Sequence, residues 1–154
     1  MELKLMRRMR TIKLTIGISL LCIFSYSGYG QSGKEEYHAI VETLNYYLDG
    51  GTNNDFSTLK KAFHDNAIMS SIGDDAYQEV NALEFFGNAM KPGPKSNRET
   101  YIVHISQTGT TANARLELIY SDAIITDYMN LLKVDGQWKI VSKIFFKKVL
   151  LNKP

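Results

Sequence analysis

The sequence is poor in cysteine, and Cys22 is the single one among its 154 residues. It lies in an apolar run close to the N-terminus, in a segment of the kind that is removed during secretion. The rest of the chain has no thiol, which excludes disulfides and cysteine nucleophiles. The fold must therefore rest on its hydrophobic core, for which a chain of this length is sufficient.

The sequence also lacks an apolar run of the length that a membrane span requires. Leu14–Phe24 is eleven residues long, whereas a spanning helix needs about 20. A basic segment, Lys4–Lys13, precedes this run, and the small residues Gly28 and Gly30 follow it, just before Gln31. This order is typical of a secretory signal peptide.

We therefore predict a cleaved leader at residues 1–30, a mature domain at residues 31–154 and a secreted or periplasmic location. The alternative is an uncleaved membrane anchor. Without the leader, Lys and Arg fall from 18 to 13 and Asp and Glu from 16 to 15, so the net charge changes from +2 to −2. The basic balance belongs to the leader, so we expect neither nucleic acid nor, after cleavage, a membrane as a partner.

Several motifs that carry chemistry are missing as well. The sequence has no glycine-rich phosphate loop, G-x-S-x-G or H-E-x-x-H pattern. His38, His64 and His104 fall in three different predicted elements without paired spacing, which does not indicate a zinc site. Asp74-Asp75 is too short an acidic run to indicate calcium. We expect no metal and no cofactor.

The C-terminal stretch, residues 101–148, has the alternation of a four-stranded antiparallel meander. Asp135-Gly136 is a strong hairpin signal, because a type I′ turn needs residues that tolerate positive φ. Gly109-Thr110 and Ser121-Asp122 supply two further turns. The register that these turns set collects one continuous apolar face, formed by Tyr101, Val103, Ile105, Gln107, Ala112, Ala114, Leu116, Leu118, Ile125, Asp127, Met129, Leu131, Trp138, Ile140, Ser142, Ile144 and Phe146.

Helical periodicity covers residues 34–49, and we expect Gly50-Gly51 to end this helix. Asp55 is a suitable N-cap for a second, shorter helix. A short strand at residues 67–72 and a helical turn near residues 80–90 complete the prediction. Helices first and a meander last indicate an α+β fold. We predict helices packed on a curved antiparallel β-sheet that forms a cone, with an internal pocket between the first helix and the sheet.

Three stretches carry a family resemblance: the helix end Tyr47–Gly51, the segment Leu59–Ala67 and the strand pair Thr126–Val141. They resemble the nuclear transport factor 2-like (cystatin-like) superfamily, and within it the secreted bacterial branch labelled putative lumazine-binding, over residues 35–148. The resemblance implies the cone-shaped fold, and it is specific for fold rather than for activity.

The same superfamily contains ketosteroid isomerases, in which a first-helix tyrosine works with two acidic residues. By spacing, the tyrosine position falls here at Thr43 or Leu44, and the position of the general base falls near Ser71. Two of the three groups are therefore absent, which argues against isomerase chemistry. Asp127 is the remaining acidic candidate.

Asp127 is the sharpest functional candidate, because a carboxylate on an apolar face is costly unless it is paired or hydrogen-bonded. It could anchor a ligand or act as a general base, with His64 as a partner in proton transfer. The structural alternative is a carboxylate that accepts hydrogen bonds from a tyrosine, Ser142 or His64. The residues that could line a pocket for a small, partly apolar molecule are Tyr47, Phe63, Met69, Tyr101, Trp138, Ser142 and Asp127, although such an aromatic set also suits plain core.

Three functional hypotheses follow. The first is a secreted small-molecule-binding domain with Asp127 as its polar anchor. The second is a cofactor-independent lyase, isomerase or cyclase that uses Asp127, with His64, for proton transfer. The third is a homodimer built through the outer sheet face, which the register assigns Tyr128 and Phe145. Lysines at 139, 143 and 147 on that face would oppose association if their strand were an edge.

Overall fold

The computed structural model describes residues 33–73 and 75–150. The predicted leader, residues 1–30, lies outside these ranges. The chain divides into two units, Met1–His38 and Ala39–Pro154. Residues 33–52 are helical, and the packing described below is that of the second unit. No helix among the described residues combines the length and hydrophobicity that crossing a bilayer requires.

The fold is α+β, as predicted, with helices on one face of a curled, open sheet. After the first helix, the elements are α2 (Phe56–Leu59), the 3-10 helix η1 (Lys60–Ala62), β1 (Phe63–Gly73), β2 (Ala76–Asn81), α3 (Ala82–Ala89), β3 (Arg98–Thr108), β4 (Thr111–Tyr120), β5 (Ala123–Val134) and β6 (Gln137–Val149). The strands form a six-stranded sheet in the order β2-β1-β6-β5-β4-β3. All neighbours are antiparallel except β1 and β6, which run parallel.

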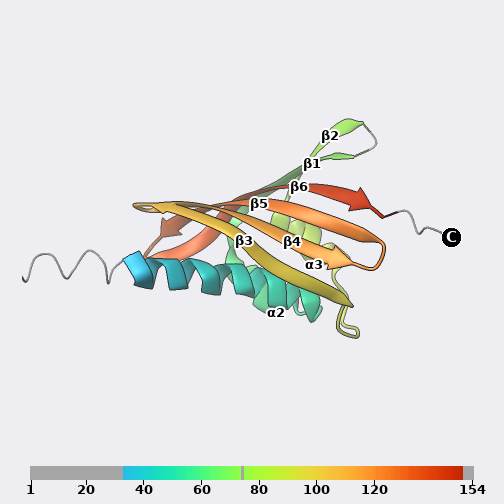
Figure 1. Cartoon of the computed structure of the whole chain (residues 1–154), viewed down its shortest axis with the longest axis horizontal. Helices are drawn as coiled ribbons and strands as arrows, with labels where there is room; N and C mark the ends of the chain where they lie inside the picture. The colour runs from blue at the N-terminus through green and yellow to red at the C-terminus, as the bar shows by residue number, and fades with distance from the viewer. Residues whose placement is uncertain (1–32, 74, 151–154) are drawn as a thin grey trace, which may run out of the picture. The chain divides into compact units, whose positions relative to one another are not determined.

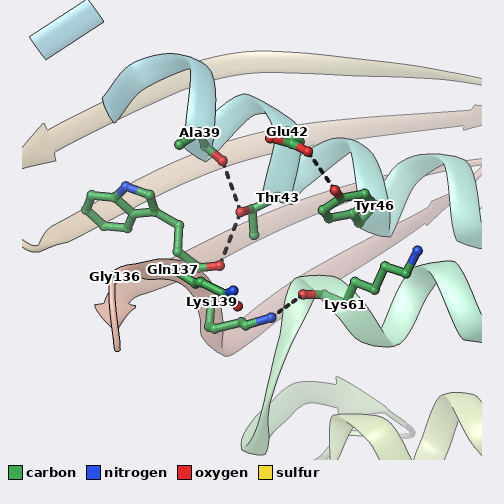
Figure 2. A pocket seen from close by; sticks show the side chains of 9 residues that line it. Ala39, Glu42, Thr43, Tyr46, Lys61, Gly136, Gln137 and Lys139 are labelled. Carbon is green, nitrogen blue, oxygen red and sulfur yellow. Dashed lines mark hydrogen bonds between the residues drawn. The ribbon is translucent and has the colours of Figure 1, made fainter. Parts of the chain in front are cut away.

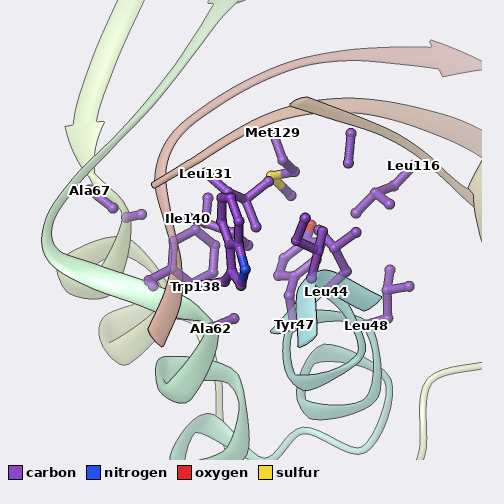
Figure 3. Packing of buried hydrophobic residues seen from close by; sticks show 14 of the residues in the cluster. Leu44, Tyr47, Leu48, Ala62, Ala67, Leu116, Met129, Leu131, Trp138 and Ile140 are labelled. Carbon is purple, nitrogen blue, oxygen red and sulfur yellow. The ribbon is translucent and has the colours of Figure 1, made fainter. Parts of the chain in front are cut away.

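The core lies between the first helix and the inner face of the sheet (Figure 3). The helix contributes an apolar stripe at the expected spacing, and β4, β5 and β6 contribute the inward side chains of their alternating pattern. The largest of the fully buried apolar side chains are Ile40, Leu44, Leu59, Leu116, Leu118, Met129, Leu131 and Ile140. Figure 1 shows the part of the helix that belongs to the second unit, residues 39–52, along this face of the sheet.

The three predicted hairpin turns are confirmed, and so is the register next to each of them. Leu131 pairs with Ile140 across the Asp135-Gly136 turn. Leu116 pairs with Asp127, which lies on the buried face, as predicted. Both turn residues have positive φ, 49° at Asp135 and 79° at Gly136, as a type I′ turn requires.

The predicted register is wrong in the second half of β6. Leu131 pairs with Ile140 but Asn130 pairs with Ser142, so Val141 is an extra residue and forms a β-bulge. A bulge shifts the alternation by one residue and bends the strand. Lys143 is therefore buried, whereas Ser142 lies with Asn130 on the outer face.

The predicted register is also wrong for residues farther along β6 and for part of β3. Beyond the bulge Ile144 and Phe146 are exposed and Phe145 packs against the core. In β3, Val103 is the extra residue between Ile102 and His104, and Tyr101 points to the outer face. Both bulges lie within long strands, where they allow the sheet to curl.

Gly50-Gly51 does not end the first helix, contrary to prediction, because the helix continues to Thr52. These glycines permit close approach instead. A Cβ on Gly50 would lie 2.4 Å from the backbone nitrogen of Leu59, and a Cβ on Gly51 would lie 2.6 Å from Nη2 of Arg98. The same Nη2 donates to the helix carbonyl of Leu48 at 3.1 Å, which also accepts a hydrogen bond from the Thr52 hydroxyl at 2.7 Å.

Two further predictions need adjustment around β1. The strand is longer than residues 67–72, and a second strand, β2, pairs with it; only its last two residues, Val80 and Asn81, fall in a predicted element, the helical turn near residues 80–90. Asp55 does cap α2, because its side chain accepts a hydrogen bond from the Thr58 amide at 3.1 Å. Strand β6 lies between β1 and β5 and is not an edge.

Candidate functional site

A polar cluster lies in the middle of the core, formed by Tyr47 of the first helix, Asp127 of β5 and Lys143 of β6. The Asp127 side chain is 0 % exposed and that of Lys143 only 4 %. The Tyr47 hydroxyl donates to Asp127 Oδ2 at 2.7 Å, and Lys143 Nζ forms an ion pair with Oδ1. Each carboxylate oxygen therefore has a donor, which satisfies a group that would otherwise be very costly to bury.

The electrostatics of this cluster follow from its burial. Desolvation lowers the pKa of Lys143, and the neighbouring Asp127 carboxylate opposes that shift. Desolvation also raises the pKa of Tyr47 well above its usual value, and Asp127 adds to the increase. Tyr47 is thus a neutral donor at physiological pH. Lys143 Nζ also stands 4.3 Å from the ring centroid of Phe145, a cation–π distance.

Sequence reasoning missed Lys143, because strict alternation assigned it to the outer face. The tyrosine that meets Asp127 is Tyr47, whereas counting back from the glycines had indicated Thr43 or Leu44. Thr43 instead donates to the backbone carbonyl of Trp138 at 3.2 Å. A signal for Lys143 was nevertheless present, since an inward carboxylate requires a donor or a cation nearby.

An open hollow of about 380 Å³ lies between the first helix and the β5–β6 hairpin. Figure 2 shows the helix side chains on one side and those of η1 and the hairpin on the other. Its lining residues are Ala39, Glu42, Thr43, Tyr46, Lys61, Gly136, Gln137, Trp138 and Lys139. We call it the helix–hairpin hollow.

Several polar side chains converge on the helix–hairpin hollow. The Tyr46 hydroxyl donates to Glu42 Oε1 at 2.6 Å. Lys139 Nζ donates to the carbonyl of Lys61 at 2.8 Å, and Lys61 Nζ stands 5.6 Å from the centroid of the Tyr46 ring. The Thr43–Trp138 hydrogen bond joins the helix to β6 beside the hollow.

A second hollow, of about 390 Å³, adjoins the first and shares Lys61, Gln137 and Lys139 with it. Phe63 and His64 are among its other lining residues. His64 Nδ1 accepts a hydrogen bond from the Asn66 amide at 3.1 Å. The lining of this hollow does not include Asp127, so the two predicted catalytic residues are not brought together there.

The remaining predicted pocket residues are dispersed. Tyr47 and Met69 are buried in the core, and Trp138 is buried while bordering the helix–hairpin hollow. Tyr101 and Ser142 lie on the outer face, where Tyr101 donates to Glu99 at 2.5 Å. The roles predicted for all of these residues remain predictions. Among the described residues, no group of three or more His, Cys, Asp and Glu side chains is placed to hold a metal ion.

The outer face of the sheet carries an apolar hollow of about 310 Å³. Its exposed apolar and aromatic side chains come from β1, β2, β5 and β6, and they are Ile72, Tyr77, Tyr128, Ile144 and Phe146. Ile72 is 69 % and Phe146 68 % exposed. We call this surface the outer-face patch.

A comparison with the profiles of known protein families identifies the family of this chain. A family profile described as "Putative lumazine-binding" matches residues 35–146. The chain belongs to this family. Its members' label names a ligand class but not the residues that hold the ligand.

Similar solved structures place this chain in the broader nuclear transport factor 2-like group. It is similar to a nuclear transport factor 2-like protein of unknown function from Shewanella baltica OS155, with 33 % identity, 74 % of this chain and 94 % of the other covered, and a TM-score of 0.68. A similar protein of unknown function from Methylobacillus flagellatus KT has 28 % identity, coverages of 74 % and 93 %, and a TM-score of 0.66. The superfamily resemblance is confirmed.

A relative with a named activity is more distant. The protein "Aldolase FrzH" from a Cladobotryum species is 24 % identical over 114 residues, which cover 73 % of this chain and 91 % of that protein.

Proposed function

We propose that this family member binds a small molecule in the helix–hairpin hollow. The observation that carries the proposal is an open space of about 380 Å³, within the usual range for ligand pockets, on which the polar groups of Glu42, Tyr46, Lys61 and Lys139 converge. The family description, which names a small heterocyclic ligand, supports it.

A ligand in this hollow does not contact Asp127, which is not among the lining residues. That carboxylate is fully buried and both its oxygens have donors, so we assign it to the support of the core. We propose further that the protein acts outside the cytoplasm after its leader has been removed, because of the basic, apolar and small-residue order at the N-terminus.

The test is a thermal-shift and native mass-spectrometry screen of residues 31–154 against lumazine and a metabolite library. Ala39→Phe would fill the hollow from the helix side, and Ala89→Phe adds the same bulk at the exposed end of α3. We expect Ala39→Phe to weaken every true ligand at least about tenfold, which corresponds to about 1.4 kcal/mol, and Ala89→Phe to have no effect. Unchanged affinities in Ala39→Phe would disprove this site.

A second candidate function is catalysis of carbon–carbon bond chemistry without a cofactor. The buried Tyr47–Asp127–Lys143 cluster favours it, because clusters of titratable groups with shifted pKa values concentrate at catalytic sites. The distant aldolase relative supports it as well. In this candidate Asp127 transfers the proton, and His64 lines a separate hollow.

Its test compares Asp127→Asn and Tyr47→Phe with the parent in aldol and retro-aldol assays on small aldehydes and ketones. Removing a general base typically costs 10²–10⁴-fold in rate. Far-ultraviolet circular dichroism shows whether each variant is folded. A folded Asp127→Asn variant with undiminished turnover would exclude this candidate.

We also propose that the protein forms a homodimer through the outer-face patch. The register correction strengthens the predicted surface, because it removes Lys143 and adds Ile144 and Phe146, while Phe145 still lines the hollow. Contiguous exposed apolar side chains of this kind mark interaction surfaces. Sedimentation of residues 31–154 should show a dimer that Tyr128→Glu converts to a monomer. A parent that sediments as a monomer at tens of micromolar would refute the proposal.

A further inference from the structure

The two lysines of the helix–hairpin hollow, Lys61 and Lys139, differ from the buried Lys143 in their charged partners. Lys143 has Asp127 as its counter-charge. Within the described residues, by contrast, neither Lys61 nor Lys139 forms an ion pair. Lys139 Nζ reaches only a backbone carbonyl, and Lys61 Nζ stands over an aromatic ring. Two ammonium groups therefore line one hollow, and neither is held in an ion pair among the described residues.

The same hollow also holds one carboxylate, Glu42, so two ammonium groups against one carboxylate leave a formal net charge of 2 − 1 = +1. Glu42 already accepts the Tyr46 hydroxyl at 2.6 Å, and this hydrogen bond raises the pKa of Tyr46. Tyr46 therefore stays protonated at physiological pH and keeps its bond to Glu42. The side chains of Lys61 and Lys139 come from η1 and β6, opposite the helix side chains Thr43 and Tyr46 (Figure 2). A guest in the hollow would meet the two ammonium groups and the Tyr46 ring, over which Lys61 Nζ stands at 5.6 Å.

The shape of the hollow favours a compact, ring-containing guest. Gly136 has no side chain to fill the space at the hairpin, and Ala39 presents only a methyl group from the helix. The Tyr46 ring is an aromatic surface on which a planar group can stack. Flexible lysine side chains can reach a carboxylate in several positions, because the ammonium group is a point charge on a long stem.

We propose that the ligand of the helix–hairpin hollow is a small aromatic carboxylate, with Lys61 and Lys139 binding its carboxylate and Tyr46 contacting its ring. This inference rests on the proposed ligand-binding function and adds the chemical class of the ligand. The attraction is between partly exposed charges, so salt weakens it.

The test uses acid and amide pairs of equal shape, benzoate with benzamide and 2-naphthoate with 2-naphthamide. Isothermal titration of residues 31–154 should show each acid binding at least about tenfold more tightly than its amide, equivalent to about 1.4 kcal/mol. Raising the salt from about 0.05 to about 0.5 M should weaken the acids and leave the amides unchanged.

Lysine variants locate the carboxylate. Lys61→Gln and Lys139→Gln should each reduce acid affinity at least about fivefold while leaving the amides unaffected, an effect of about 1 kcal/mol. Lys95→Gln, in the exposed loop before β3, is the matched control and should change nothing. Acids that bind no better than their amides, acids that do not bind at all, or lysine variants without effect would each overturn the inference. If Ala39→Phe weakens the binding of the library ligands, the hollow is still supported as the ligand site. The proposed site and the proposed ligand class can therefore fail separately.

Discussion

Replacing Lys143 with methionine should destabilise the domain strongly, because it leaves the Asp127 carboxylate buried with one donor fewer. Asp127 is 0 % exposed, so water cannot take the place of the lost ammonium group. Breaking a buried ion pair from one side typically costs about 3–5 kcal/mol. This is a large share of the roughly 5–15 kcal/mol of unfolding free energy that a domain possesses. Asp127→Leu should cost a similar amount, since it leaves Lys143 buried and uncompensated.

The double variant Asp127→Leu/Lys143→Met should lose less than either single variant. Replacing a whole buried ion pair with apolar side chains is often neutral or stabilising. One penalty remains, because the Tyr47 hydroxyl loses its acceptor, at a cost of about 1–3 kcal/mol. A further Tyr47→Phe change should remove most of that residual loss.

The assay is guanidinium unfolding of residues 31–154, followed by the fluorescence of Trp138, which is only 3 % exposed. The control is Glu117→Gln, which breaks the exposed pair with Arg115 at 3.8 Å and should change the unfolding free energy by less than about 1 kcal/mol. If Lys143→Met costs less than about 1 kcal/mol, or if the double variant equals the sum of the singles, the reasoning about a coupled buried pair is wrong.

Three further predictions concern other parts of the chain. Gly50→Ala should destabilise the domain by about 1–3 kcal/mol in chemical denaturation, because the new Cβ would lie 2.4 Å from the Leu59 backbone nitrogen; an unchanged midpoint would contradict the close approach. The hydrogen bond from the Ser57 side chain is the main cause that lowers the pKa of Asp55 from 3.8 to about 2, so Asp55→Ala should lower the melting temperature above pH 3.8 and lose its effect as the pH falls through about 2. A difference that persists undiminished in acid would refute this cap. Intact-mass analysis of the exported protein should show an N-terminus at Gln31, and a full-length mass would favour the membrane-anchor alternative.

Much of the fold could be predicted from the sequence, because the signals involved are local. Asp135-Gly136 fixes a hairpin through its own backbone preferences, and the register beside it follows at once. The alternating apolar residues of β4 and β5 then indicate which face is buried. The inward orientation of Asp127 follows from this pattern alone.

The composition of the candidate site depended on the tertiary structure. Val141 forms a bulge that no residue pattern indicates. A bulge bends the strand, and the bend that a strand needs depends on how the sheet curves around the helix, which is distant in sequence. That single extra residue turns Lys143 inward to Asp127 and turns Ile144 outward. The alternation of strand residues carries no information about where it is interrupted.

Lys61 and Lys139 are separated by 78 positions and become neighbours only when η1 packs beside β6. Glu42 and Tyr46 lie one helical turn apart on the first helix, so their mutual contact could be anticipated from spacing. The hollow that they border could not, because it exists only where the helix meets the hairpin. The sequence by itself thus determined the three hairpin turns and the buried faces of the strands next to them, since these follow from local backbone preferences and periodicity. The tertiary structure decided which charged side chains meet, because such meetings depend on sheet curvature and on contacts between distant segments.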